Sequence, residues 1–236
     1  MKSLNHSCEL ILALDVSSLD EAKKILHTIG SQLKWVKVGL QLFTSYGPSI
    51  VTALSDLGFN IFLDLKFHDI PNQVAGAIKS LKGLPIGLLT LHTSGGEEML
   101  QWANRAREEI NHPMQLLGIT VLTSMDQNGL KSIGVNASPE EQVLKLGTLG
   151  IKSGLQGLVC SPLELAMLRK KLGERPLLVT PGIRPTGADL NEQKRVMTPK
   201  EAVLAGASYI VIGRPILNAP NPAETVESIL EEIKNV

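Results

Sequence analysis

The sequence predicts a single (β/α)8 barrel over residues 1–236, with its functional site at the carboxyl ends of the strands. Eight short apolar runs alternate with longer segments of helical period, a pattern typical of parallel strands joined by right-handed crossovers. The 236 residues also divide into eight units of about 30 residues, the size of one strand and one helix. An open doubly wound sheet usually carries a glycine-rich turn after its first strand, and LILALDVSSLD has no glycine, which favours the closed barrel.

The expected strands are the eight apolar runs, namely Leu10–Leu14, Trp35–Val38, Ile61–Leu65, Leu88–Leu91, Leu116–Leu122, Leu158–Cys160, Leu177–Thr180 and Tyr209–Ile212. The clearest expected helices carry apolar residues at positions i, i+3, i+4 and i+7, and they are Leu19–Gly30, Pro71–Lys82, Glu97–Ile110, Glu140–Gly147 and Ala223–Val236. One segment, Thr123–Pro139, is longer than a unit requires, and we expect it to form a loop over the site.

Composition excludes several classes of partner. The chain has 23 basic and 23 acidic side chains, and this zero net charge argues against a nucleic-acid or membrane-surface partner. No apolar run reaches the roughly 18 residues that cross a bilayer, and the amino-terminal residues lack a signal peptide's apolar core. We therefore expect a cytoplasmic protein in which Cys8 and Cys160 are free thiols.

The most informative segment is IFLDLKFHDIPNQV, residues 61–74. Residues i and i+2 of a strand share a face, so Asp64 and Lys66 are expected to project together into the mouth of the barrel. Asp69 follows three residues later, in the turn before the next helix, which gives the pattern DxKxxD. On the second strand, Lys37 lies between two valines, where a purely structural strand would carry an apolar residue.

These charges predict an electrostatic array. Each of them alone could be an ion pair that caps a strand end at a solvated rim, as could Asp15 at the end of the first strand. Two lysines and two aspartates together have zero net charge, which lowers the cost of burying them. Neighbouring carboxylates keep Lys66 protonated, and a charged lysine suits proton delivery to a carbanion rather than Schiff-base chemistry.

A phosphate site is expected after the seventh and eighth strands, which end in VTPGIRP and VIGRP. Gly213 lets the backbone approach a ligand, Arg214 can bind phosphate through two N–H groups, and Arg184 is placed to assist. The alternative for either arginine is a plain turn with a surface side chain. The polar segment Gly187–Arg195 between them is expected to form a lid from which Gln193 reaches the ligand.

Histidines and metal-binding patterns carry less information. His68, beside Asp69, could act as a general base, although we interpret it as structural, and the role of His92 stays open. There is no HExxH motif and no spacing of two histidines with a carboxylate, so the sequence indicates no metal.

From about Leu10 to Ile216, the chain resembles the orotidine 5′-phosphate decarboxylases of the bacterial type. The resemblance rests on ordered motifs, which are LALD ending at Asp15, VKVG around Lys37, DLKFHDIPN at 64–72, VLTS at 121–124, VCSP at 159–162, TPGIRP at 180–185 and IGRPI at 212–216. DLKFHDIPN is the most specific of them, and the others gain weight from their order.

The resemblance implies a homodimer that decarboxylates orotidine 5′-phosphate to UMP in de novo pyrimidine biosynthesis without a cofactor. It implies that Lys66 protonates C6 of the pyrimidine within an array of Lys37, Asp64, Lys66 and Asp69, in which Asp69 comes from the other subunit. The remaining implied roles are ribose binding by Asp15 and Lys37, a place by the pyrimidine for Thr123, and phosphate binding by Gln193, Arg184, Gly213 and Arg214.

One position departs from the family pattern. The family segment usually reads DIPNT, and its threonine contacts ribose across the dimer interface, whereas this chain has Gln73. Glutamine can also donate a hydrogen bond, but its reach is longer. The charged array does not depend on this position.

Two alternatives remain. A related barrel decarboxylase acts on a sugar-acid phosphate, shares DxKxxD and uses magnesium, but it carries a glutamate near the position of Lys37, so lysine here favours the nucleotide enzyme. A non-catalytic barrel that binds a phosphorylated ligand would need the phosphate site without a buried proton donor, and the intact array argues against it.

Overall fold

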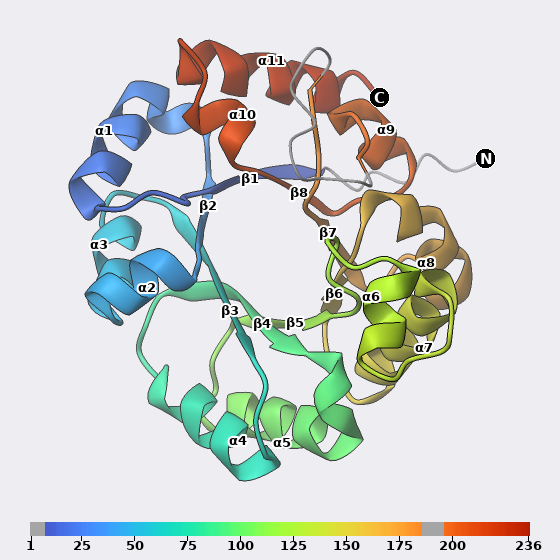
Figure 1. The fold of residues 1–236 in the computed structure, drawn as a ribbon. Coiled ribbons are helices and arrows are strands. Elements are labelled where there is room, and N and C mark those ends of the chain that lie inside the picture. Colours follow the sequence, from blue (N-terminus) through green and yellow to red (C-terminus); the bar gives the residue numbers. More distant parts are fainter. Residues whose placement is uncertain (1–7, 186–195) are drawn as a thin grey trace.

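The computed structural model describes residues 8–185 and 196–236. Its eight strands pair in parallel and in chain order, and the eighth closes onto the first (Figure 1). Helices surround this ring on its outer side (Figure 1). The predicted (β/α)8 barrel is therefore confirmed.

Each expected strand is present. The strands are β1 (Glu9–Ala13), β2 (Trp35–Val38), β3 (Asn60–Phe67), β4 (Ile86–His92), β5 (Gln115–Ile119), β6 (Gly157–Val159), β7 (Leu177–Thr180) and β8 (Tyr209–Ile212). The largest difference from expectation is at β5, which ends at Ile119 although the apolar run continues to Leu122. Val121 and Leu122, at the end of that run, lie beyond the strand and line a cavity, so their apolar character reflects the cavity wall and not strand pairing.

The helices are α1 (Leu19–Ile29), α2 (Leu40–Tyr46), α3 (Ser49–Ser55), α4 (Pro71–Ser80), α5 (Gly96–Glu109), α6 (Gln127–Ser132), α7 (Pro139–Lys152), α8 (Leu165–Leu172), α9 (Pro199–Leu204), α10 (Arg214–Leu217) and α11 (Pro222–Lys234). Short 3₁₀ turns lie at Gly30–Gln32, Thr93–Gly95 and Pro162–Glu164. Among the described residues, no helix combines the length and the apolar character that a membrane span requires.

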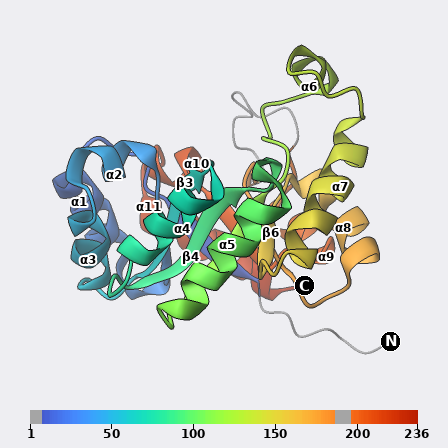
Figure 2. The same cartoon turned by 90° about the horizontal axis from the view of Figure 1, so that it is seen from below.

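The segment Thr123–Pro139 corrects one prediction, because it is not purely a loop. It contains the helix α6, which projects from the rest of the barrel (Figure 2). The helix begins where the Asp126 carboxylate accepts hydrogen bonds from the backbone N–H groups of Asn128 and Gly129, at 3.1 and 3.0 Å. Gly129 inside the helix weakens the helical pattern in the sequence.

Alternation along the strands separates two hydrophobic layers. On β1, Leu10 and Leu12 pack outward against the helices, while Ile11 and Ala13 point into the barrel. The interior layer consists of Ile11, Ala13, Phe62, Leu88, Leu117, Val179 and Val211. Both faces of each strand are therefore buried, which explains why the strands read as continuous apolar runs.

Aromatic side chains fill the amino-terminal end of the barrel. Trp35 and Tyr209, each at the start of a strand, meet edge to face with ring centroids 5.4 Å apart. The indole Nε1–H of Trp35 donates a hydrogen bond of 2.6 Å to Glu9 Oε2. A Cβ at Gly87 would lie 2.6 Å from the Trp35 ring, so this glycine makes room for the indole. These side chains close the interior of the barrel at its amino-terminal end.

Candidate active site

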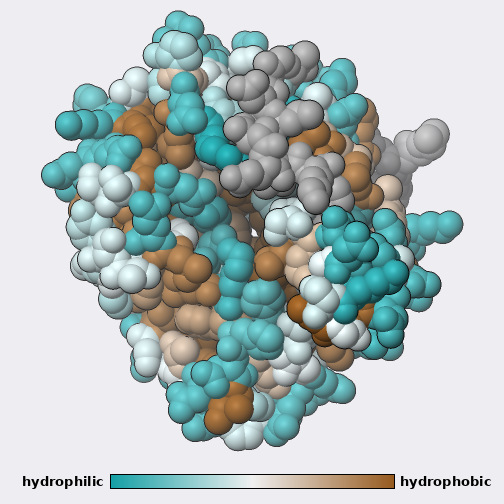
Figure 3. Space-filling view, viewed as in Figure 1, coloured by the Kyte–Doolittle hydropathy of each residue, from teal (hydrophilic) through white to brown (hydrophobic). Residues whose placement is uncertain are grey.

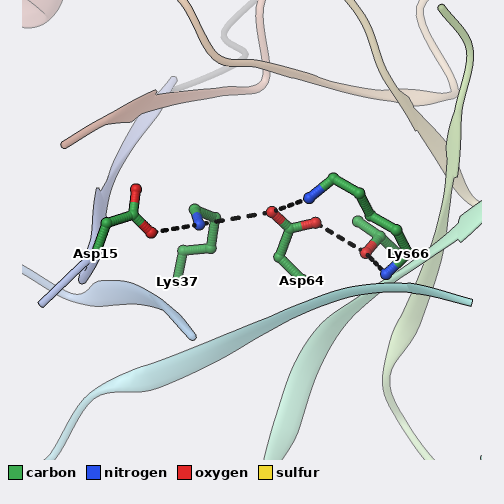
Figure 4. A network of polar contacts seen from close by, with 5 residues as sticks. Asp15, Lys37, Asp64 and Lys66 are labelled. Atoms are coloured by element: carbon green, nitrogen blue, oxygen red, sulfur yellow. Dashed lines mark hydrogen bonds and ion pairs between the residues drawn. The ribbon is translucent and has the colours of Figure 1, made fainter. Parts of the chain in front are cut away.

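Four charged side chains from the first three strands form a chain of ion pairs (Figure 4). Lys37 Nζ on β2 lies 3.1 Å from Asp15 Oδ1, just beyond β1, and 3.6 Å from Asp64 Oδ2 on β3. Lys66 Nζ donates a hydrogen bond of 2.8 Å to the same Asp64 Oδ2. The array of Asp15, Lys37, Asp64 and Lys66 alternates in charge, so each ammonium group has a carboxylate beside it.

Asp64 is the most enclosed member of this array. Its side chain is 10% exposed, compared with 31% for Lys66 and 58% for Asp15. Burial acts to raise the pKa of Asp64, but the charges of Lys37 and Lys66 and hydrogen bonds from Lys66 and Thr90 together hold that pKa below its usual value. Asp64 is therefore a carboxylate at neutral pH and draws both ammonium groups toward it.

Asp64 and Lys66 lie at an irregularity in the pairing of β3 with β4. The β3–β4 register passes from Leu63↔Leu89 directly to Phe67↔Leu91, so three residues of β3 stand opposite one residue of β4. Lys66 has φ +53°, in the left-handed region that non-glycine residues seldom occupy. The expected proximity of Asp64 and Lys66 is confirmed, but a bulge produces it instead of the regular pleat from which it was predicted.

Thr90 on β4 is a further member of the network that the sequence reasoning missed. Its Oγ1 accepts a hydrogen bond of 2.9 Å from the backbone N–H of Lys66 and donates one of 2.9 Å to Asp64 Oδ1. The residue is fully buried. The available signal was the single polar residue inside the apolar run LLTL, residues 88–91.

Gly39 leaves room for the ammonium of Lys37. A Cβ at this position would lie 3.2 Å from Lys37 Nζ and 3.5 Å from Asp15 Oδ1. The backbone of Gly39 is extended, with φ −94° and ψ −172°, a conformation open to any residue. Space beside the array, and not backbone conformation, is therefore what glycine provides here.

A cavity of about 240 Å³ opens above the array. The charged residues that line it are Lys37, Asp64 and Lys66, and its other lining residues are Phe62, Ile119, Val121, Leu122, Thr123, Val159, Cys160, Pro181 and Val211. Figure 3, in the same view as Figure 1, shows a hollow at the centre of the molecule, bordered by hydrophilic and hydrophobic residues. Thr123 lines the same cavity as the array, and its charged and apolar walls suit a flat ring with polar substituents.

Two arginines adjoin each other beyond β7 and β8. Arg184 is 8% exposed, and its Nη1 donates a hydrogen bond of 2.9 Å to the carbonyl oxygen of Ile183. Burial and the nearby positive charge of Arg214 lower the pKa of Arg184. Gly213 precedes Arg214, and a Cβ there would lie 3.3 Å from Ala13 Cβ, so the backbone runs close to β1. Paired guanidinium groups at adjacent strand ends favour an anion such as phosphate.

Two other predicted site residues, Asp69 and Gln73, are exposed in this chain. Asp69 is exposed, and its Oδ1 accepts a hydrogen bond of 2.6 Å from the backbone N–H of Ile70. No ion pair between described residues links Asp69 to Lys37 or Lys66. Gln73 is exposed in the first turn of α4. Gln193, with the expected lid Gly187–Arg195, lies outside the described residues.

His68 and His92 lie together near the array. Their ring centroids are 5.3 Å apart with the planes tilted by 34°. Burial, with the charges of His68 and Lys66, lowers the pKa of His92, so its imidazole is neutral at pH 7. Within residues 8–185 and 196–236, no cluster of three or more His, Cys, Asp or Glu side chains could hold a metal ion.

A larger hollow, of about 1140 Å³, lies at the amino-terminal end of the barrel and contains no member of the array. Its Arg169 donates hydrogen bonds to the carbonyl oxygens of Gly206 and Pro176, at 2.9 and 2.7 Å, and so acts structurally. Burial raises the pKa of its Cys8 thiol to about 12, which leaves this cysteine unreactive. The smaller cavity, which is lined by Lys37, Asp64 and Lys66, is therefore the candidate site.

Comparison with known proteins gives one consistent result. Residues 9–229 match the model of the orotidine 5′-phosphate decarboxylase / HUMPS family. Curated orotidine 5′-phosphate decarboxylases from Opitutus terrae and Actinobacillus succinogenes are 50% and 47% identical, each over 97% of this chain and 100% and 99% of their own lengths. The crystal structure of the Lactobacillus acidophilus enzyme superposes with a TM-score of 0.85 at 37% identity, over 96% of this chain and 99% of that one.

Proposed function

The chain belongs to the orotidine 5′-phosphate decarboxylase / HUMPS family, and we propose that it converts orotidine 5′-phosphate to UMP with Lys66 as the proton donor. The single observation that carries the assignment of Lys66 is the ammonium held 2.8 Å from Asp64 Oδ2 in the wall of the cavity. The family match supports the reaction itself, a step of pyrimidine biosynthesis.

The proposed step needs one proton and no added oxidant or reductant. The bond between pyrimidine C6 and its carboxylate breaks, carbon dioxide leaves, and the electron pair stays on C6. The Lys66 ammonium stabilises this charge as it develops and then donates a proton to C6. The neutral amine recovers a proton from water. Asp64, which also pairs with Lys37, keeps the Lys66 ammonium in place, and no cofactor takes part.

The substrate's ribose and base are assigned to the cavity. Asp15 and Lys37, which already pair at 3.1 Å, bind the ribose hydroxyls, and Thr123 contacts the pyrimidine. In the proposed orientation, the glycosidic bond lies over the array and C6 faces Lys66. Support for this orientation comes from Asp64 and Lys66 lying in the same cavity wall.

The substrate phosphate is assigned to Arg184, Arg214, Gly213 and Gln193. The proximity of the two guanidinium groups supports this, since a dianion relieves their mutual repulsion. Binding energy from a phosphate distant from C6 can be used to close the site and so accelerate the chemical step.

We assign Asp69 and Gln73 to the site of a second subunit in a homodimer. Support comes from their exposure and from the lack of an ion pair between Asp69 and the array among the described residues of one chain. A partner's Asp69 would complete the predicted set of Lys37, Asp64, Lys66 and Asp69. Gln73 would reach the partner's ribose with a longer side chain than threonine has.

The decisive assay follows the ultraviolet absorbance of orotidine 5′-phosphate. Wild-type protein should consume it, and Lys66→Ala should lower kcat by at least about 10²–10³, the usual cost of losing one electrostatic contact in the transition state. Lys34→Ala is the matched control, because this exposed lysine pairs with Glu9 at the opposite end of the barrel. Circular dichroism should be the same for all three proteins, and a Lys66→Ala variant with control-like kcat would remove Lys66 from the proposal.

The same assay separates the sugar-acid alternative. Because the proposed array supplies its own positive charge, prolonged EDTA treatment should leave the rate unchanged. A rate lost with EDTA and restored by Mg²⁺ would contradict the proposed mechanism. It would favour the magnesium-dependent relative.

A further inference from the structure

Thr90 is fully buried on β4, and its hydroxyl faces Asp64 and Lys66 of the neighbouring strand β3. A backbone N–H can only donate, so the hydroxyl must use a lone pair for Lys66 N and has its single proton free for Asp64 Oδ1. Both contacts measure 2.9 Å. The hydroxyl therefore has a fixed polarity, and it connects the backbone of Lys66 to the carboxylate that holds the Lys66 ammonium.

The backbone contact lies at the bulge itself. Between Leu63↔Leu89 and Phe67↔Leu91 the ladder is interrupted, and in place of a ladder carbonyl the Thr90 side chain accepts the N–H of Lys66. Lys66 has φ +53°, which is unfavourable for a lysine unless its surroundings fix it. The Thr90 hydroxyl contacts the backbone of this residue from the facing strand.

We propose that Thr90 is a positioning residue for decarboxylation, whose hydroxyl sets the direction of the Lys66 ammonium through the Lys66 backbone and the Asp64 carboxylate. The inference rests on the proposed function, with Lys66 as proton donor. Thr90 is not among the residues that line the cavity, so it acts through its two neighbours and not on the substrate.

The alternative is that Thr90 only satisfies buried polar groups and supports the fold. Thr93 provides a matched comparison, because it is equally buried and its hydroxyl donates a hydrogen bond of 2.6 Å to the carbonyl oxygen of Ile119, away from the ion pairs. Loss of either hydroxyl should lower stability. Only the loss of the Thr90 hydroxyl should misdirect the ammonium.

The experiment compares Thr90→Val, Thr90→Ser and Thr93→Val for kcat, KM and melting temperature with orotidine 5′-phosphate. Thr90→Val keeps the side-chain shape without the hydroxyl, and we expect kcat to fall on the order of 100-fold, the cost of about 1 Å of misplacement. The KM should change by less than about threefold, since no substrate contact is lost. Thr90→Ser should recover kcat to within about fivefold of wild type, and Thr93→Val should keep kcat within about twofold.

Several outcomes would overturn the inference while leaving the proposed function intact. They are a wild-type kcat in Thr90→Val, an equal loss in Thr93→Val, or a serine variant as slow as the valine variant. If Thr90→Val does not fold, Thr90→Ala removes the same hydroxyl without placing a methyl group beside the carboxylate, and the same expectations apply. Failure of the wild-type protein to consume the substrate would instead contradict the proposed function.

Discussion

At the scale of single residues, Asp64 is where the contacts of the active site converge. Its carboxylate accepts hydrogen bonds from Lys66 and Thr90 and pairs with Lys37. Two ammonium groups that would otherwise repel each other are thereby held on one side of a cavity. An enclosed carboxylate with several donors is a rigid support, because each donor that it loses leaves an unmatched charge in a poorly solvated place.

Substitution of Gly39 should displace the Lys37 ammonium, one of the groups that pair with Asp64. In Gly39→Ala the new Cβ would lie 3.2 Å from Lys37 Nζ and push the ammonium from its place between Asp15 and Asp64. We expect kcat/KM to fall roughly 10-fold, since small displacements in an aligned site are costly. Gly76→Ala serves as the control, because its Cβ would meet no atom within 4 Å. Equal kinetics for the two variants would show that Lys37 tolerates displacement.

The ion pairs of Asp64 should also make stability depend on pH. The pKa of Asp64 lies below its ordinary value of 3.8, so the pairing stabilises the folded protein above that pH and is lost as pH falls through the lower folded-state pKa. Urea unfolding of wild type and Asp64→Asn from about pH 7 to pH 3 measures this. We expect wild type to be the more stable at pH 7, with the difference narrowing below the ordinary pKa. A constant difference across this range would mean that the charge of Asp64 adds no stability.

At the scale of elements, the helices approach the barrel closely where small residues allow it. The expected helix at Glu140–Gly147 extends in fact over Pro139–Lys152. A Cβ at Gly147 would lie 2.9 Å from a methyl group of Leu158 on β6. This glycine, which reads as a helix end in the sequence, instead lets α7 pack against the sheet.

Replacement of glycine by alanine should therefore have opposite effects on stability in α4 and in α7. Gly76→Ala in α4 gains helix propensity without a steric contact and should raise the free energy of unfolding by about 0.5–1 kcal/mol. Gly147→Ala forces a methyl group into the packed contact with Leu158 and should lower it by about 1–3 kcal/mol. Urea denaturation at constant protein concentration gives both values. Stabilisation of both variants would show that the α7 contact relaxes freely.

At the scale of the whole molecule, the barrel brings distant parts of the chain to one end. Residues of the ion-pair array come from the first three strands, and the paired arginines follow the seventh and eighth. Because β8 pairs with β1, the carboxyl ends of these two strands meet at the same rim. A ligand with a charged ring at one end and a phosphate at the other can span these two groups.

The proposed sharing of Asp69 predicts complementation between inactive variants. In a mixed dimer of Lys66→Ala and Asp69→Ala chains, the site built on the Asp69→Ala chain keeps its own Lys66 and receives an intact Asp69. Random exchange makes half of the dimers mixed, each with one working site of two, so we expect about a quarter of wild-type activity per subunit. Mass measurement of the exchanged dimers is the control. No recovery after proven exchange would place both residues in the site of one chain.

The sequence by itself determined the barrel and most of the charged residues of its site. Continuous apolar runs at regular intervals encode strands buried on both faces, and the bounds of β2, β7 and β8 agree residue for residue. Lys37 and Asp64 could be recognised because a charge at an interior strand position is costly without a functional reason. Local periodicity and composition suffice for such features.

Only the tertiary structure decided how these residues meet. Thr90 contacts Lys66 and Asp64, which lie 24 and 26 residues before it in the chain. No local sequence pattern specifies these contacts or the bulge at Lys66. The space that Gly39 leaves for Lys37, and the approach of Arg184 to Arg214, likewise depend on neighbours through space. Periodicity reports which face of an element is buried, whereas register and side-chain partners are set only when the strands pair and the barrel closes.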